Sequence, residues 1–336
     1  MSSEFEENNK NVKIFQRILL LSLFWPLLIG ILQLINQMTR NFQFVNNVTG
    51  LFTENVYEGR IQLLSGEPSW AMLHILTIGF ILIRLYVLKR SKVVLLTIFI
   101  MGLLYIFSFS LYGYLVLLIS IFLFFVIGRK INLKVILVAS FLLITIAVLL
   151  PSIINIFGLD NYSVNRFDKF SDLASFKEIV YVDGSFFVRI VFPIIGFLEF
   201  LSNPIFGLGG GLSYLEFSKF LLLYFPDGVH FPEVYYNLYI DKTIFTPRNL
   251  FSKVLAEEGL IGGTLFIGFL YMVYKESKQS KLALFAFVLS LSIFMNFDSY
   301  ATINVWMLLG LIRGGFFNEI GEKNNDGKYN VSLSNR

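Results

Sequence analysis

Ionisable residues gather where an apolar stretch begins at Phe251. Arg248 precedes that stretch, and Lys253, Glu257 and Glu258 lie one to three helical turns beyond Arg248. A charged side chain costs roughly 2.5–3.5 kcal/mol at the centre of a membrane helix, and less near the helix ends. The pattern therefore predicts a polar pocket at the mouth of a membrane-spanning helix. The alternative is a self-neutralising ion pair between Lys253 and Glu257, which are four residues apart.

A glycine-rich turn follows an apolar stretch that contains Arg189. Pro204 interrupts a helix there, and glycines follow at once, at Gly207, Gly209, Gly210 and Gly211. Glycine tolerates positive φ and allows a backbone to approach a ligand closely. The turn could therefore aim backbone N–H groups at an anion. A flexible corner without a ligand is an equal alternative.

A second set of polar residues precedes position 70. Arg60 and Glu67 come first, and Pro68 with Ser69 then begins a helix beside Trp70, which suits a membrane interface. Glu67 could line the same outer cavity as the residues around Arg248. The alternative is that its carboxylate is merely favoured by the start of a helix.

The composition indicates a membrane protein. Of 336 residues, 56% are hydrophobic and 15% are charged, and the mean hydropathy is +0.70. A soluble domain of this length requires more polar surface. The absence of cysteine excludes disulfides and thiolate metal ligands. The two histidines, His74 and His230, are too far apart in sequence to suggest a metal cluster, and His74 is more simply explained as a packing residue.

Apolar runs predict an all-α, polytopic protein with about eight membrane-spanning helices, because about 20 helical residues cross a hydrocarbon core of about 30 Å. The predicted spans are Ile14–Asn36, Trp70–Leu88, Val93–Ser110, Tyr112–Ile127, Val135–Pro151, Phe251–Tyr274, Leu282–Phe297 and Ala301–Ile312. They belong to one membrane domain over residues 14–317. The polar tails are residues 1–13 and 318–336, and the second of these is predicted to be disordered.

Lysines and arginines predict the orientation of these spans. They cluster at residues 10–17, 89–92, 129–134, 275–281 and 313, and eight alternating crossings place all five clusters on the cytoplasmic side. Both termini are then cytoplasmic. A large loop over residues 152–250 faces outward, and its apolar stretches 186–201 and 217–225 are predicted to be helices at the interface or dipping partly inward. Topology explains the basic residues, so nucleic-acid binding has no support.

Four motifs occur in order along the chain. They are the Glu67-Pro68-Ser69 helix start, the hairpin from Ser108 to Gly113, Arg189, and the turn from Asn203 to Gly209. Together they resemble motifs of the Wzy-type O-antigen and capsule repeat-unit polymerases and of the related O-antigen ligases. Those families share a Glu-Pro-Ser helix start, a serine-rich hairpin, an outer-loop arginine and a Pro, then Gly-x-Gly turn.

A fifth motif discriminates between the two families. The ligases carry His-Asn, nine residues, then Gly-x-x-Gly. This chain has Asn249, nine residues, then Gly259-Leu-Ile-Gly262, with Arg248 in place of the histidine. Arginine, ten residues, then glycine resembles a motif of the polymerases. The resemblance therefore favours a polymerase over a ligase.

The resemblance implies a GT-C-like membrane fold and an enzyme that joins undecaprenyl-diphosphate-linked oligosaccharide repeat units at the outer face of the cytoplasmic membrane. It implies that Arg189 and Arg248 stabilise the diphosphate, for which the bidentate guanidinium is suited. The general base is then expected among Glu67, Glu258 and His230. Further substrate contacts are expected from Arg60, Gly207, Gly209, Gly210, Asn249, Lys253, Glu257 and Gly259.

No cofactor is expected, and with no outward Asp-rich motif the resemblance implies chemistry based on arginine without a metal. The implied partners are membrane lipid, a flippase and a chain-length regulator.

Two other functions remain open at this stage. A ligase would share the fold and transfer the glycan to a different acceptor. A transporter or flippase of lipid-linked oligosaccharide would be expected to show internal repeats and charges at the bilayer midplane. The sequence shows no repeat, and its polar residues gather toward one face of the membrane. A non-catalytic assembly protein would leave the ionisable residues near Arg248 unexplained.

Overall fold

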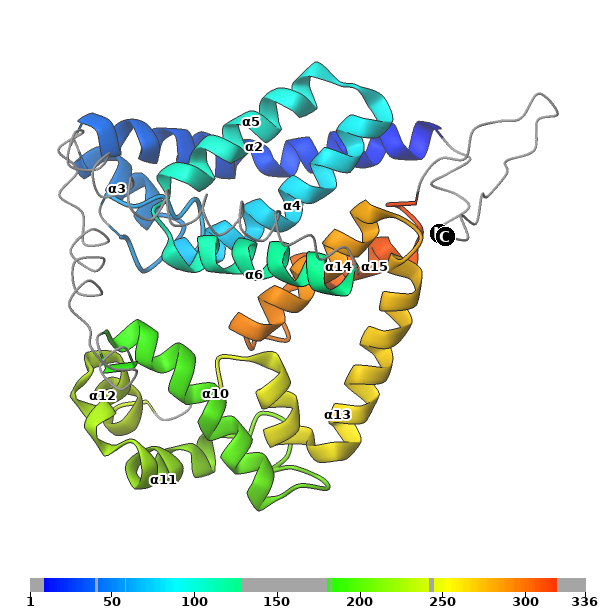
Figure 1. Cartoon of the computed structure of the whole chain (residues 1–336). Coiled ribbons are helices and arrows are strands. Elements are labelled where there is room, and N and C mark those ends of the chain that lie inside the picture. Colours follow the sequence, from blue (N-terminus) through cyan, green and yellow to red (C-terminus); the bar gives the residue numbers. More distant parts are fainter. Residues whose placement is uncertain are drawn as a thin grey trace.

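The computed structural model describes residues 9–39, 42–57, 59–128, 180–181, 183–241 and 245–318, which form helices and no strand. The predicted span Val135–Pro151, the basic residues at 129–134 and most of both tails lie outside the described residues. Figure 1 shows two groups of helices, which face each other across the region where α10 approaches α14.

The larger group is a bundle around one apolar core. Its members are α2 (Asn9–Thr39), α3 (Phe42–Gly50), α4 (Pro68–Lys89), α5 (Lys92–Phe107), α6 (Leu111–Ile127), α13 (Leu250–Ser277), α14 (Lys281–Asn296) and α15 (Ile303–Arg313). Leu82, Val94, Val288 and Leu308 are fully buried in the core. Many apolar side chains on the outside of the bundle are exposed, as expected of helices that contact lipid.

The smaller group has a core of its own. It comprises α10 (Gly184–Ser202), α11 (Tyr214–Tyr224), the 3₁₀ helix η1 (Pro226–His230) and α12 (Pro232–Tyr239). Phe187, Phe192, Phe217 and Phe245 are almost completely buried there. The rings of Phe217 and Phe245 stack with centroids 4.9 Å apart. This group joins the bundle through α10, which packs against α13.

The predicted all-helical membrane fold is confirmed, whereas the count of eight spans is not. Four described helices are long and apolar enough to cross a membrane, namely those at Asn11–Thr39, Pro68–Lys89, Gly184–Ser202 and Leu250–Ser277. A fifth crossing results if α5 and α6 count as one span. They meet at 114° and were predicted as two spans, but each has only 16 or 17 residues. Helices α14 and α15 are shorter apolar helices.

The helix α10 also differs from expectation. Its stretch was predicted to lie at the interface or to dip partly inward, yet it has 19 residues and enough apolar character to cross a membrane. Asp183 begins the helix and accepts hydrogen bonds from the backbone N–H groups of Ser185 and Phe186. Pro193 lies inside the helix without ending it.

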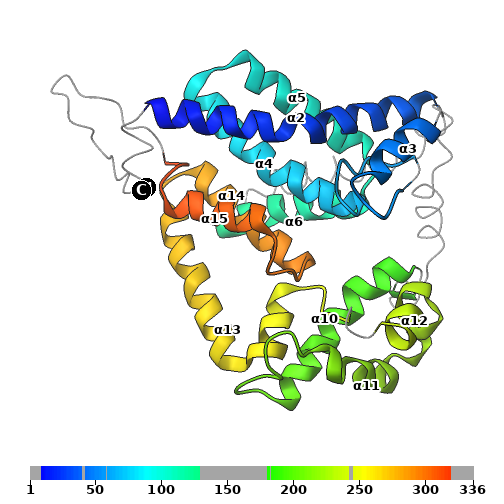
Figure 2. The same ribbon diagram turned by 180° about the vertical axis from the view of Figure 1, so that it is seen from behind.

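The basic turns share one end of the bundle. Figures 1 and 2 place the start of α2, the α4–α5 turn, the α13–α14 turn and the end of α15 at the same end. The starts of α4 and α6 lie at the opposite end, near α12. The basic turns of the described residues therefore lie on one side, as the predicted topology requires.

The helix α13 is broken at Gly259, and the Asn203–Gly209 turn fills the break. Gly259 has φ 62° and ψ −158°, which leaves backbone groups of the helix without their usual partners. The N–H groups of Leu208 and Gly209 donate to the carbonyls of Ala256 and Glu257, both at 2.8 Å, and the N–H of Leu260 donates to Pro204 at 2.8 Å. The turn thus provides hydrogen-bond partners for backbone groups of α13 at the break.

Candidate active site

A cavity of about 460 Å³ opens where the starts of α4 and α6 meet α10 and α12. It collects charged and aromatic side chains from segments up to 240 residues apart in sequence. Its ionisable lining residues are Tyr57, Arg60, Glu67, Tyr112, Asp183, Arg189, Glu233 and Arg248. Three guanidinium groups and three carboxylates therefore share one cavity, with Trp70, Phe109 and Phe186 as apolar walls.

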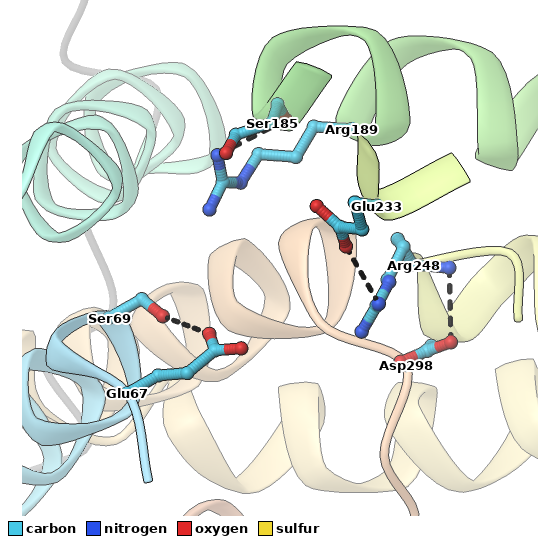
Figure 3. A network of polar contacts seen from close by, with 7 residues as sticks. All are labelled: Glu67, Ser69, Ser185, Arg189, Glu233, Arg248 and Asp298. Atoms are coloured by element: carbon cyan, nitrogen blue, oxygen red, sulfur yellow. Dashed lines mark hydrogen bonds and ion pairs between the residues drawn. The ribbon is translucent and has the colours of Figure 1, made fainter. Parts of the chain in front are cut away.

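Glu67 reaches the cavity because it immediately precedes α4. It is extended, with φ −146° and ψ 144°, and Pro68 follows at the first helical position, where its missing N–H is not needed. The Glu67 carboxylate accepts a hydrogen bond from the Ser69 hydroxyl at 2.9 Å. Figure 3 shows this carboxylate below the Arg189 guanidinium and to the left of Arg248.

The start of α6 forms the wall beside Arg189. Arg189 lies on α10, one turn after Ser185, and its guanidinium donates to the Ser185 carbonyl at 3.2 Å. The guanidinium carbon stands 4.9 Å from the centre of the Tyr112 ring, a cation–π contact. Ser110 caps α6 by accepting from the N–H of Gly113 at 3.3 Å. The predicted Ser108–Gly113 hairpin is thus part of the cavity wall.

Arg248 is held through both its backbone and its side chain. Its φ is 54°, a left-handed conformation that non-glycine residues rarely adopt. The Arg248 N–H donates to Asp298 Oδ2 at 3.0 Å, and the guanidinium forms an ion pair with Glu233 Oε1 at 3.1 Å (Figure 3). The next residue, Asn249, caps α13 by accepting from the N–H groups of Phe251 and Ser252.

Burial and the charged side chains of the cavity shift the pKa of the Tyr57 phenol. Burial raises the pKa of Tyr57, and the Glu67 carboxylate raises that pKa further, whereas the Arg60 guanidinium lowers it. Glu233 contributes a smaller upward effect on the same pKa. Tyr57 therefore stays protonated near neutral pH and can donate a hydrogen bond to a ligand in the cavity.

The structure brings four of the predicted site residues together: Arg60, Glu67, Arg189 and Arg248 all line the cavity. The remaining nine do not line it. They are His230, Gly207, Gly209, Gly210, Asn249, Lys253, Glu257, Glu258 and Gly259.

The glycine turn serves α13 rather than the cavity. The backbone N–H of Gly209 is directed to a helix carbonyl, and a Cβ at Gly207 would stand 2.4 Å from backbone atoms of Glu257. Real Cβ atoms essentially never come within 3.0 Å of another non-bonded heavy atom. The glycines at 207 and 259 are thus required by close backbone packing, and the N–H groups of residues 207–209 in the predicted anion-binding turn all donate to backbone carbonyls.

The ionisable residues within α13 form a separate cluster. Lys253 Nζ lies 4.0 Å from Glu257 Oε1, which matches the alternative of a neutralising pair four residues apart. Lys253 also lies 5.1 Å from the centre of the Tyr300 ring. Glu258 is exposed beside Gly210. The predicted roles of these residues in substrate binding and catalysis have no geometric support from the cavity.

Sequence reasoning missed Glu233 and Asp298, which contact Arg248. Asp298 carried a usable signal, because it is an acidic residue between two apolar runs on the predicted outer side. Glu233 carried none, since an acidic residue in a long polar loop is ordinary. Tyr57 and Tyr112 were also missed, and only the fold shows that their rings face the same cavity.

The described residues contain no group of three or more His, Cys, Asp or Glu side chains that could hold a metal ion. A family model described as O-antigen ligase matches residues 96–267, slightly more than half of the chain. The matched stretch includes Arg189, Glu233 and Arg248, whereas Arg60 and Glu67 precede it. No curated protein and no solved structure matches the chain.

Proposed function

Since the chain belongs to the O-antigen ligase family, we propose that it is a polymerase that joins undecaprenyl-diphosphate-linked oligosaccharide repeat units. Family membership and the apolar helices together support a multi-pass membrane enzyme of the glycosyltransferase kind that handles lipid-linked oligosaccharide. The observation that carries the proposal is the convergence of Arg60, Arg189 and Arg248 with the Glu67 carboxylate on one cavity.

The arginines suit the leaving group. In the proposed reaction an acceptor hydroxyl oxygen attacks the anomeric carbon of the donor glycan, and the bond from that carbon to the diphosphate breaks. The electron pair of the broken bond leaves with the diphosphate, whose growing negative charge needs fixed cationic donors. Arg189 and Arg248 lie on separate elements and approach the cavity from different sides (Figure 3), so they can hold the diphosphate between them.

Glu67 is the proposed general base. The acceptor hydroxyl must lose its proton as its oxygen attacks, and a carboxylate within hydrogen-bonding reach can take that proton. Of the predicted bases, Glu67 lines the cavity, whereas Glu258 and His230 do not. The other glutamate in the cavity, Glu233, already forms an ion pair with Arg248. The Glu67 carboxylate accepts a single serine hydroxyl in the described structure.

Arg248 supports a polymerase over a ligase. It occupies the position at which the ligase motif has histidine, and its guanidinium lies in the cavity rather than outside it. A histidine there could move a proton, whereas an arginine stays charged and binds phosphate. We further propose that the reaction takes place at the outer face of the cytoplasmic membrane, where a flippase delivers the units and a chain-length regulator limits the product.

The test is reconstitution of the purified protein with one defined lipid-linked repeat unit. A ladder of carrier-linked oligomers on a gel is expected. Arg189→Ala and Arg248→Ala should each lower the rate by about 10²-fold or more, the loss seen when one group that stabilises transition-state charge is removed. Arg90→Ala, at the opposite end of α4, is the matched control and should keep the wild-type rate.

The same assay separates the rival functions. Transfer of the glycan to a different acceptor without a ladder would identify a ligase. Movement of lipid-linked sugar across vesicles without any joining would identify a transporter. A ladder of wild-type rate from both arginine variants would overturn the assignment of the diphosphate to this cavity.

A further inference from the structure

A second hollow lies on the outer face of α12. It is a shallow trough of about 570 Å³, lined by Tyr235, Tyr236 and Tyr239 together with His230. The three tyrosines are 52%, 47% and 61% exposed, so about half of each large aromatic side chain faces outward. The trough includes His230, which the active-site cavity leaves without a role.

Helical geometry explains why these side chains share one face. Tyr235 and Tyr239 are four residues apart, and their rings are in contact with centroids 4.8 Å apart. Val234 and Leu238 are buried on the other side of α12 and anchor the helix in its own core. The tyrosines therefore project away from that core without disturbing it.

The trough and the active-site cavity are both lined by residues of the short helix α12. Glu233, which pairs with Arg248 in the cavity, is three residues before Tyr236, and Tyr236 is three residues before Tyr239. Residues three apart on a helix are neighbours on its surface. The helix α12 thus carries Glu233 in the cavity and, within two turns, the tyrosines of the trough.

We propose that this trough binds the glycan part of the lipid-linked substrate, outside the cavity in which the reaction takes place. A tyrosine offers an aromatic face for the C–H groups of a sugar ring and a hydroxyl that exchanges hydrogen bonds with sugar hydroxyls. The described lining residues carry no acidic or basic group other than His230, which suits a neutral sugar chain better than a diphosphate. The proposal rests on the proposed function, because it takes the glycan to be the substrate.

Membrane lipid is the competing occupant, since tyrosine is also common at membrane interfaces. The neighbouring helix α11 shows what an apolar outer face looks like in this protein. It exposes Leu215, Leu222 and Leu223, at 60%, 47% and 64%. The trough has phenols in place of leucines and begins beside the residue that pairs with Arg248. These two observations favour a glycan.

The trough predicts an effect on chain length. A surface that holds the growing glycan beside the cavity raises the local concentration of its reactive end, as a second binding site does in a bivalent ligand. Loss of the trough should therefore shorten the polymer.

The binding test uses the full-length protein in detergent and carrier-free oligosaccharide of several repeat units, released from the native polysaccharide. Isothermal titration calorimetry should show about tenfold weaker binding in the Tyr235→Ala, Tyr239→Ala double variant, which loses two aromatic contacts. The double phenylalanine variant keeps both rings and should recover most of the affinity. Tyr224→Ala, an equally exposed tyrosine on α11, should bind as the wild type does.

Three outcomes would overturn the proposal. They are equal affinity in the wild type and the double alanine variant, recovery of binding by leucine at both positions, and an unchanged length distribution of the polymer. Recovery by leucine would indicate an apolar lipid-facing surface. The calorimetry needs no catalysis, so its expected result in a protein that forms no ladder would contradict only the proposed function.

Discussion

At the scale of single residues, the Arg248–Glu233 pair sets the charge of the cavity. The two side chains are only partly exposed, at 28% and 44%, and form an ion pair at 3.1 Å. In the proposed reaction, an incoming diphosphate would compete with the Glu233 carboxylate for the same guanidinium. The proposal therefore predicts that the affinity for the lipid diphosphate depends on how strongly this carboxylate neutralises Arg248.

Glu233→Gln tests this competition. The amide oxygen can still accept the Arg248 hydrogen bond, but the cavity gains one unit of positive charge. We expect the KM for the lipid-linked unit to fall by up to about fivefold, since a partly exposed pair contributes up to about 1 kcal/mol. Steady-state kinetics at low and high salt would measure this, and the gain should shrink at high salt.

Glu216→Gln is the control for that change. It removes a carboxylate from the exposed Glu216–Lys219 pair on α11, away from the cavity, and should leave KM unchanged. A higher KM in Glu233→Gln would contradict the competition and would instead make Glu233 a residue that orients Arg248.

The residues differ in how far sequence could identify them. Arg60, Glu67, Arg189 and Arg248 were found because a charged residue beside an apolar run is conspicuous in a membrane protein. The same reasoning selected Lys253 and Glu257, which pair with each other. Sequence spacing alone does not distinguish a charged residue that lines the cavity from one that pairs within its own helix. The rotation of each helix about its own axis decides which side chains face the cavity.

At the scale of elements, the joint between α13 and the Asn203–Gly209 turn determines where Arg248 lies. The helix begins at Leu250, two residues after Arg248, and its break at Gly259 is filled by backbone of the turn. The Asn203–Gly209 turn directly follows α10, the helix that carries Arg189. One joint therefore connects the two helices that supply two of the arginines of the cavity.

Gly259→Ala tests the joint. A Cβ at this position would lie 2.4 Å from the Ile205 carbonyl oxygen, and the residue has positive φ. We expect a loss of about 2 kcal/mol or more of folding stability, from the strained φ and the displaced turn, and a marked loss of activity. Thermal unfolding of the purified protein in detergent would show a lower Tm.

The matched control is Gly268→Ala in the same helix. A Cβ at Gly268 meets nothing within 4 Å, so alanine should leave Tm unchanged or raise it, because alanine favours a helix interior. An equal Tm for Gly259→Ala and wild type would contradict the packing of the turn against the break.

Sequence predicted most helices but not their interruptions. The run Trp70–Leu88 matches α4 within two residues, because apolar length determines such a helix. A hairpin between α5 and α6 was predicted, but its angle of 114° was not, since the boundary between Ser110 and Tyr112 carries no information on the angle. The positive φ of 48° at Phe109 depends on the packing of the hairpin, which no local pattern reveals.

At the scale of the whole molecule, the basic turns and the cavity lie at opposite ends of the helix bundle. The basic turns gather at one end, and the cavity opens between the starts of α4 and α6 at the other (Figures 1 and 2). Because lysine and arginine favour the cytoplasmic side, the cavity is expected to face outward. This is the side on which the proposed reaction takes place.

The natural chain contains no cysteine, so single cysteines report its sidedness without background. We expect a membrane-impermeant maleimide to label Asn55→Cys and Asp227→Cys in right-side-out vesicles, and to label Gln279→Cys only after permeabilisation. All three positions are exposed. Asn203→Cys at the end of α10 is the decisive variant, since α10 is long enough to cross the membrane. Labelling of Asn203→Cys from the cytoplasmic side would contradict the outward loop and place the end of α10 inside.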